Sequence, residues 1–126
     1  MKKFLFILGA TLLLAGCSMG EQTLCGTYHG VLPAASGPGI ETDITFNKNG
    51  TFSRHQVYLD EKDGVFDESG TYKIRNNIIT LSSGNGESSY YQIEDRQIRQ
   101  LDMEKKPVTG DLAQYYVLKQ SQSCAN

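Results

Sequence analysis

Residues 40–46 read IETDITF, and the next four residues, 47–50, read NKNG. In the first stretch the even positions are isoleucine, threonine, isoleucine and phenylalanine, and the odd positions between them are polar. A period of two is typical of a β-strand that buries one face. The NKNG stretch holds residues that tolerate a positive φ and form hairpin loops. Together they predict a strand that ends in a hairpin.

Similar extended runs occur on both sides of this stretch, and Asn76-Asn77 is a two-residue turn signal between two of them. Loops are predicted at 60–64 and at 82–89, the second around Gly84-Asn85-Gly86. No stretch of ten or more residues keeps a helical stripe, so helix is expected only as a cap around Val108 to Gln114. The predicted strands begin at Cys25 and continue at 40–46, 51–59, 71–75, 78–81, 90–94, 97–101 and 113–119.

Eight short runs separated by turn signals indicate an all-β fold, either an antiparallel sandwich or a barrel. Closure into a barrel removes exposed strand edges. An eight-stranded barrel has room for interior side chains or for one small ligand. Because only about 100 residues supply the strands, we expect an interior filled mostly by Ile, Leu, Phe and Tyr.

The chain begins with Lys2 and Lys3, followed by the apolar run 4–14. This is the layout of a secretory signal, and the run is too short for a membrane-spanning helix, which needs about 20 residues. It ends in Leu14-Ala15-Gly16-Cys17, which resembles the lipobox of bacterial lipoproteins. The resemblance implies acylation (palmitate and related chains) of Cys17 and removal of residues 1–16. Several acyl chains anchor a protein firmly to a membrane.

The lipobox leaves a lipidated tether at 17–24 and one domain at 25–126. The alternative is an ordinary signal peptide cut near Ala15, with Cys17 a free thiol. Ser18 follows Cys17, and in many Gram-negative lipoproteins a residue other than Asp there goes with sorting to the outer membrane. The expected location is therefore the outer membrane, at its periplasmic face or at the cell surface.

Residues 17–126 number 110 and carry 10 basic and 14 acidic side chains, a net charge of −4. That balance argues against nucleic acid or an anionic surface as partner, because such partners require clustered Lys and Arg. Besides Cys17, the cysteines are Cys25 and Cys124. In an exported protein this pair predicts a disulfide, worth up to about 4.7 kcal/mol for a loop of roughly 100 residues. Two free thiols are the alternative.

Nearly all of this domain resembles the NlpE family of copper-resistance lipoproteins, in its N-terminal domain. The resemblance implies a lipocalin-like β-barrel on an outer-membrane lipoprotein, with roles in copper handling, surface adhesion and signalling of envelope stress to the Cpx two-component system. Its first stretch is the most specific, and larger family members carry a second domain. The matching residues are Cys25-Gly26-Thr27-Tyr28-His29-Gly30-Val31-Leu32-Pro33, Pro38-Gly39-Ile40, Asn49-Gly50-Thr51-Phe52, Tyr58-Leu59, Phe66, Gly70-Thr71-Tyr72, Ile79-Thr80-Leu81, Tyr90-Tyr91 and Leu101-Asp102.

One departure from the family concerns the loop after Pro33. The family has a Cys-x-x-Cys pair there, whereas this chain has Ala34 and Gly37. Thiolates select Cu(I), and a pair of thiols is what a redox relay needs. The sequence therefore predicts that the usual thiol metal site is absent and that this loop does no redox sensing.

The remaining candidates for a metal site are His29, His55 and Met103, with Glu41 or Asp43 as a further oxygen donor. A protein metal site usually has three or four ligands. Copper is the one cofactor that the resemblance implies. The alternative is that both histidines are ordinary surface side chains.

This chain contains no recognisable catalytic motif, so we expect that it is not an enzyme. The carboxylate pairs Glu61/Asp63 and Glu94/Asp95 fall in predicted loops, where solvated charge is usual. Gly84-Asn85-Gly86 lacks the lysine and the following helix of a phosphate loop. Tyr90-Tyr91 and Tyr115-Tyr116 each place one ring on either face of a predicted strand, the inner ring in the core and the outer one on the wall or in a contact surface.

Three functions remain open from the sequence. The first is an NlpE-like role in copper homeostasis or envelope-stress sensing, exercised through contacts with partner proteins. The second is a small-ligand carrier of the lipocalin kind, and the third is a periplasmic inhibitor of a hydrolase such as lysozyme. The oligomeric state is open as well.

Overall fold

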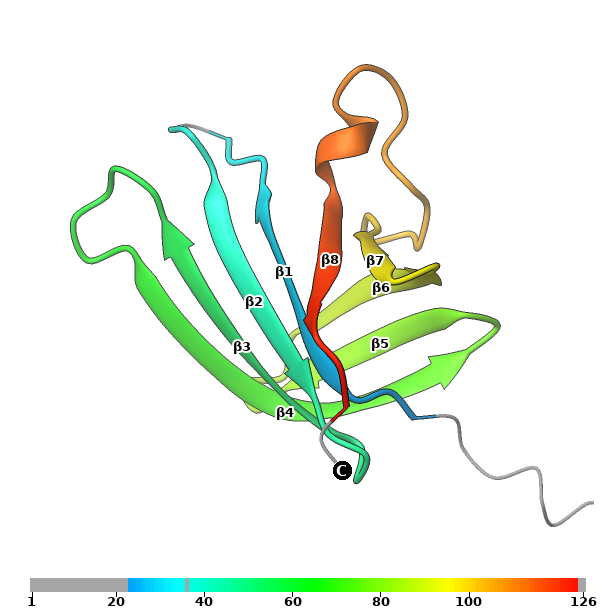
Figure 1. Cartoon of the computed structure of the whole chain (residues 1–126). Helices are drawn as coiled ribbons and strands as arrows, with labels where there is room; N and C mark the ends of the chain where they lie inside the picture. The colour runs from blue at the N-terminus through cyan, green and yellow to red at the C-terminus, as the bar shows by residue number, and fades with distance from the viewer. Residues whose placement is uncertain (1–22, 36, 125–126) are drawn as a thin grey trace, which may run out of the picture.

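A computed structural model describes residues 23–35 and 37–124. They form a closed barrel in which each of eight strands pairs antiparallel with the next and β8 pairs with β1 (Figure 1). The fold is the all-β, antiparallel barrel predicted from the sequence. The strands are β1 (Gly26–Leu32), β2 (Ile40–Phe46), β3 (Thr51–Tyr58), β4 (Val65–Arg75), β5 (Ile78–Ser83), β6 (Ser88–Glu94), β7 (Gln97–Gln100) and β8 (Val117–Gln122).

The predicted hairpins form as expected. β2 runs over the IETDITF stretch and joins β3 through the NKNG turn, in which Gly50 has φ +88°. Asn76 and Asn77 join β4 to β5 with φ values of 54° and 65°. Two consecutive positive φ values define the type I′ turn that suits the twist of a two-residue hairpin.

Several strand boundaries differ from the prediction, and three of the differences change the interpretation. β4 begins at Val65 rather than at 71, because its polar first half pairs with β3 along Ser53–Val57. β6 begins at Ser88, inside the predicted loop. Where a strand from 113 was expected, Ala113–Tyr115 form one 3-10 turn and β8 starts at Val117, so Tyr115-Tyr116 do not occupy two faces of a strand. This single turn is all that forms of the helical cap expected around 108–114.

The barrel interior is filled by apolar and aromatic side chains. Phe46, the last residue of β2, is in edge-to-face contact with Tyr28 (5.8 Å between ring centroids) and Tyr72 (5.1 Å). Such pairs add about 0.5–1.5 kcal/mol to the effect of burial alone. The buried apolar residues are Tyr28, Leu32, Ile44, Phe46, Phe52, Tyr72, Ile79, Leu81, Tyr91, Ile98, Leu101 and Leu118.

β4 is the longest strand and serves both sides of the barrel. Its first half pairs with β3 and its second half with β5, and it curves from one side of the molecule to the other (Figure 1). Gly70 lies where the two pairings meet, and a Cβ there would be 2.0 Å from the carbonyl oxygen of Ser82. Only glycine permits this approach of the two backbones, so Gly70 fixes the bend.

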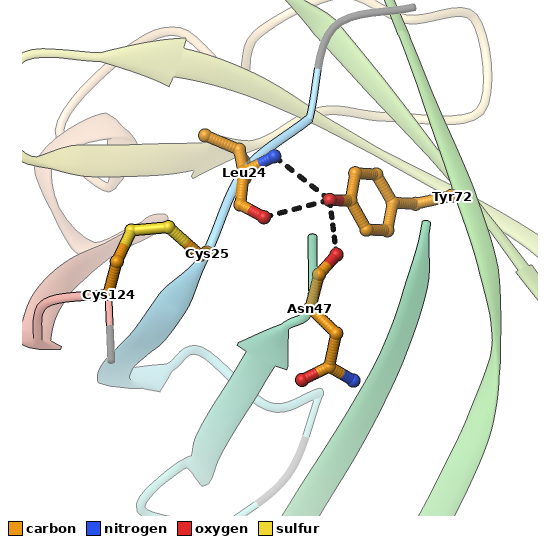
Figure 2. The surroundings of a disulfide bond; sticks show 5 residues. All are labelled: Leu24, Cys25, Asn47, Tyr72 and Cys124. Atoms are coloured by element: carbon orange, nitrogen blue, oxygen red, sulfur yellow. Dashed lines mark hydrogen bonds between the residues drawn. A yellow bond between two sulfur atoms is a disulfide. The ribbon is translucent and has the colours of Figure 1, made fainter. Parts of the chain in front are cut away.

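One end of the barrel is closed around the point where the tether enters. Cys25 and Cys124 form the predicted disulfide, with 4.9 Å between their Cα atoms. Beside it the hydroxyl of Tyr72 accepts a hydrogen bond from the backbone N–H of Leu24 (2.9 Å) and donates one to the carbonyl of Asn47 (2.7 Å), as Figure 2 shows. β1, β2 and β4 are thereby joined at this end.

The predicted signal peptide, Cys17, Ser18 and the tether up to residue 22 lie outside the described residues. Among the described residues, no helix has the length and apolar character needed to cross a bilayer.

Candidate functional site: a histidine–aspartate row on the outer wall

Both histidines lie in one row across four neighbouring strands. His29 of β1 is opposite Asp43 of β2, Asp43 is opposite His55 of β3, and His55 is opposite Asp67 of β4. Their neighbours in sequence, Tyr28 and Ile44, are buried in the interior. Because side chains alternate between the two faces of a strand, the four residues of this His–Asp row all point outward.

Each imidazole of the row is held by a carboxylate. The Nδ1 atom of His29 is 2.8 Å from Oδ1 of Asp43, and that of His55 is 2.6 Å from Oδ1 of Asp67. Glu41 approaches the other ring nitrogen of His29, with 3.9 Å between Oε2 and Nε2. When the rings are neutral, a carboxylate on Nδ1–H orients each ring and leaves the Nε2 lone pair free.

The electrostatics of the row act most clearly on His55. Its hydrogen bond to Asp67 is the main reason that the pKa of His55 is raised, and the charges of Asp43 and Glu41 add to the effect. The side chain of His55 is about half exposed, at 49%. His55 therefore gains its positive charge at a higher pH than an ordinary imidazole does.

The structure brings together two of the three predicted metal ligands and leaves out the third. Met103 lies in the turn after β7, and its neighbour Lys105 sits 5.2 Å from the ring centroid of Tyr90 on β6. In a closed barrel of eight strands, β6 is four strands away from β2, at the centre of the row. Within residues 23–35 and 37–124, no three His, Cys, Asp or Glu side chains are placed to hold one metal ion.

The side chains of the described residues offer few ligands for the copper that the family resemblance implies. Ala34 and Gly37 supply no thiol, and Cys25 and Cys124 are joined to each other. Cu(I), which prefers thiolates and thioethers, therefore lacks a cluster of suitable ligands in the described part of the chain. Imidazole nitrogens beside carboxylates are ligands for divalent ions instead, but His29 and His55 lie two strands apart, with Asp43 of β2 between them.

Behind the row, a largely buried ion pair joins the neighbouring strands β3 and β4 on the inner face of the barrel. Arg54 of β3 bonds Glu68 of β4, with Nε 2.9 Å from Oε1 and a second, shorter contact through Nη2. Its Nη1 also donates to the hydroxyls of Ser89 (3.1 Å) and Tyr91 (3.2 Å). This Arg54 cluster was not identified from the sequence, although polar residues at inward positions of the 51–59 run were a signal for it.

Burial shapes the charges of this cluster. It raises the pKa of Tyr91, and the nearby guanidinium of Arg54 only partly offsets that effect. For Arg54, burial alone opposes the charge, but Tyr91 and Glu68 outweigh it and the pKa is raised. The guanidinium thus stays charged and occupies the barrel interior at this level.

The end of the barrel away from the disulfide carries a group of exposed apolar residues, which we call the distal rim: Val31, Val65, Phe66, Leu112 and Tyr115. Each is about half exposed, from 46% for Val31 to 56% for Val65. Val31 and Val65 belong to one register row, which runs from β1 to β4 through Glu41 and Val57. The segment that holds Leu112 and Tyr115 lies at the same end, above the start of β8 (Figure 1).

Other residues singled out in the sequence take ordinary positions. Tyr91 is fully buried while Tyr90 lies on the outer wall, which confirms the expectation for this pair. Glu94, expected in a solvated loop, ends β6 and pairs with Arg99 (2.8 Å), whose hydrogen bond is the main reason that the pKa of Glu94 is lowered. Gly84-Asn85-Gly86 form the turn between β5 and β6.

Comparison with known proteins adds two family matches. The family described as NlpE N-terminal domain matches residues 28–111. The prokaryotic membrane lipoprotein lipid attachment site matches residues 1–18, a range that contains Cys17.

Three related proteins are similar over most of this chain. The 17 kDa lipoprotein of Treponema pallidum is 32% identical over 124 residues, which cover 85% of this chain and 79% of that protein. Lipoprotein NlpE of Escherichia coli is 32% identical over 99 residues, which cover 77% of this chain. The crystal structure of a lipoprotein from Shewanella oneidensis is 35% identical, with a TM-score of 0.69 over 78% of this chain and 89% of that one.

The Escherichia coli relative is the longer protein. The alignment spans only 41% of its sequence. Its crystal structure, described as that of the Cpx pathway activator NlpE, superimposes with a TM-score of 0.64 at 30% identity, over 70% of this chain and 46% of that one. What the whole of that protein does is therefore a matter of proposal for this chain.

Proposed function

Because this chain belongs to the NlpE N-terminal domain family and carries a lipoprotein lipid attachment site, we propose that it acts as an outer-membrane sensor of envelope stress. It is a membrane-anchored envelope lipoprotein. Its working surface is the distal rim, which contacts partner proteins, and it is not an enzyme. The observation that carries this proposal is the position of the rim, at the barrel end opposite the tether.

The geometry supports contact at the rim in a simple way. The described chain begins beside the disulfide, and the segments that carry the rim lie at the opposite end of the barrel (Figure 1). All exposed large apolar residues of the described chain lie in connections at that end or in the strand ends beside them. Phe66 is kept in place by an edge-to-face contact with Tyr58, with 5.4 Å between ring centroids. Preordered aromatic side chains lose little entropy on binding and are enriched in interfaces.

The filled interior argues against the carrier hypothesis. A ligand pocket of several hundred cubic ångströms would need the space that the apolar core and the Arg54 cluster occupy. No feature of the described residues supports the hypothesis that the protein inhibits a hydrolase. Contact through the rim is therefore the better-supported mode of action.

The proposal is tested by comparing two changes that remove apolar surface. Phe66→Ser with Val65→Ser alters the rim at β4. Met103→Ser is the matched control, because Met103 is 70% exposed but lies in the turn after β7, three strands away from β4 around the barrel. In a strain that lacks the native protein, we expect the rim variant to lose the envelope-stress reporter response and the Met103 variant to keep it. An unchanged response from the rim variant, at equal protein level and location, would contradict the proposal.

A second candidate function, binding of copper, is favoured by the His–Asp row. Two imidazoles with carboxylate-held Nδ1 atoms present their Nε2 atoms on one wall. We propose that they bind Cu(II) weakly and reversibly, whereas Cu(I) finds no thiolate pair. The test is aerobic titration with Cu(II) followed by electron paramagnetic resonance, and anaerobic titration with Cu(I) against a chromogenic chelator. Nitrogen hyperfine coupling that survives in His29→Gln/His55→Gln would refute this assignment.

A further inference from the structure

A second wall of the barrel carries an open groove that the proposed function does not use. It runs along the outer faces of β4 and β5 and has a volume of about 580 Å³. Opposite residues of the two strands line it in register: Thr71 with Ser82, and Lys73 with Thr80. Arg75 follows at the next outward position of β4, and Lys105 closes the side toward β6.

The charges in this groove have one sign only. Lys73, Arg75 and Lys105 line it, and no carboxylate does. In the parts of the chain that the structure describes, none of the three forms an ion pair, whereas Arg54 and Arg99 each have a glutamate partner. Like charges on one face are unfavourable, and the chain has 14 acidic side chains that could have been placed beside them. Three cations that line one groove without a carboxylate among them therefore favour an external anion there.

Lys105 is brought to the groove by a specific turn. Asp102 accepts hydrogen bonds from the backbone N–H groups of Glu104 (2.8 Å) and Lys106 (2.9 Å) through its carboxylate. Lys105 itself has φ 65°, a conformation that costs energy for a side chain of this kind. Its ammonium group then lies 5.2 Å from the ring centroid of Tyr90, opposite Thr80 of the groove. The third cation is thus positioned by contacts outside the two strands.

The spacing of the groups indicates the shape of the ligand. Lys73 and Arg75 are two residues apart on one strand, a rise of about 7 Å, and Lys105 lies over the strand two away from them, about 10 Å across the sheet. The hydroxyls of Thr71, Thr80 and Ser82 stand beside and between these charges. This arrangement matches a chain that carries acidic groups at intervals with hydroxyl groups among them.

From this groove we infer that the barrel binds an acidic glycan, a sugar chain with carboxylate groups, along the outer wall of β4 and β5. The cations pair with its carboxylates, and the threonine and serine hydroxyls bond to its sugar hydroxyls. The groove is open and carries three hydroxyl groups, with the apolar side chain of Ile78 opposite Arg75. This mixed lining suits an extended sugar chain better than a single small anion.

The test uses the full lipoprotein in detergent and oligogalacturonate as the acidic-glycan probe, with binding followed by calorimetry. Fully methyl-esterified oligogalacturonate is the neutral probe, and we expect it not to bind. Lys73→Gln/Arg75→Gln should weaken binding of the acidic probe by about tenfold or more, since two charge-assisted hydrogen bonds are lost. Lys48→Gln/Lys62→Gln removes the same charge from two exposed loops and should leave binding within about twofold.

Three outcomes would overturn the inference. One is an equal loss in both double variants, which would show that net charge alone governs binding. Another is equally tight binding of inorganic phosphate or of glycerol 3-phosphate, a soluble lipid headgroup, which would make the site one for a single phosphate. The third is no binding of the acidic probe at low salt by the wild-type protein.

Discussion

Two walls of one barrel handle charge in opposite ways. The wall of β1 to β4 carries the His–Asp row, in which each imidazole has a carboxylate within 2.8 Å. The wall of β4 and β5 carries Lys73 and Arg75 with no carboxylate beside them. Because β4 belongs to both walls, the same strand holds Asp67 in its first half and both cations in its second. On the first wall the cationic side chains are paired with carboxylates of the fold. On the second wall the described residues provide no carboxylate partner, so the charges are available to a ligand.

The interior behind each wall follows the same division. Behind the His–Asp row lies the Arg54 cluster, which is also internally paired. Along the groove, the inward residues of β5 are Ile79 and Leu81, both fully buried. Charge on the groove wall is thus supported from behind by apolar packing alone, and its removal should have little effect on folding.

The largest expected effect comes from the ion pair behind the first wall. Glu68→Gln leaves the guanidinium of Arg54 buried without its counter-ion, and the free energy of unfolding should fall by about 3 kcal/mol. We take the lower end of the usual range because the two side chains keep 11% and 23% exposure. Urea denaturation measures the change. Glu87→Gln, in an exposed turn, is the control; an equal loss there, or a loss below about 1 kcal/mol for Glu68→Gln, would contradict the pairing.

The next effect tests the strand that the walls share. Gly70→Ala adds a Cβ against the carbonyl of Ser82, so β4 and β5 must move apart. We expect a loss of about 1–3 kcal/mol, together with shifted amide resonances on both walls. Gly84→Ala is the control, since its Cβ would meet only the carbonyl of Ser69 at 3.7 Å. Resonance shifts confined to one wall would show that the walls are independent.

A smaller effect concerns the pH response of the first wall. Asp67→Asn should lower the pKa of His55, because the hydrogen bond to Asp67 is the main cause of its rise. A histidine pKa that is higher in the folded state than in the unfolded state adds stability to the fold. This stability is fully present below the unfolded-state pKa of about 6.5, and it disappears as the pH rises through the folded-state pKa. NMR titration of the imidazole gives the pKa directly. Lys73→Gln should leave it unchanged, and an equal shift there would remove the distinction between the walls.

The smallest effect is expected on the second wall. Lys73→Gln/Arg75→Gln removes two charges that have no partner in the fold, so the free energy of unfolding should stay within about 0.5 kcal/mol of the wild type. Thermal denaturation in low salt is the measurement. A loss above about 1 kcal/mol would mean that both side chains support the fold, and the groove would lose its main argument.

The sequence indicates strands best where one face is apolar. IETDITF and the two-asparagine turn were sufficient to predict β2 and the hairpin of β4 and β5. The first half of β4 was missed because its polar residues Asp67, Glu68 and Ser69 resemble a loop. This segment becomes a strand because it pairs with β3. The partner of Glu68 on that strand is Arg54, 14 residues earlier in the sequence.

The candidate sites were harder to predict because they too depend on pairing between residues that are far apart in the sequence. His29 and His55 were chosen as residue types, but only the register through Asp43 places them in one row. Met103 was grouped with them by chemistry alone, and the closed barrel puts its turn on the far side. The acidic net charge concealed the groove, because its third cation comes from Lys105, 30 residues after Arg75 in the sequence.

The disulfide at the tether end also has a mechanical consequence. Tension on the lipid anchor enters the folded domain at Cys25, which is bonded covalently to Cys124 across 99 residues of chain. The pull is therefore divided between the first strand and the last, and β1 cannot be peeled away from β8 one residue at a time. An envelope protein held at two points in this way can bear load between the membrane and whatever its rim contacts without opening the barrel.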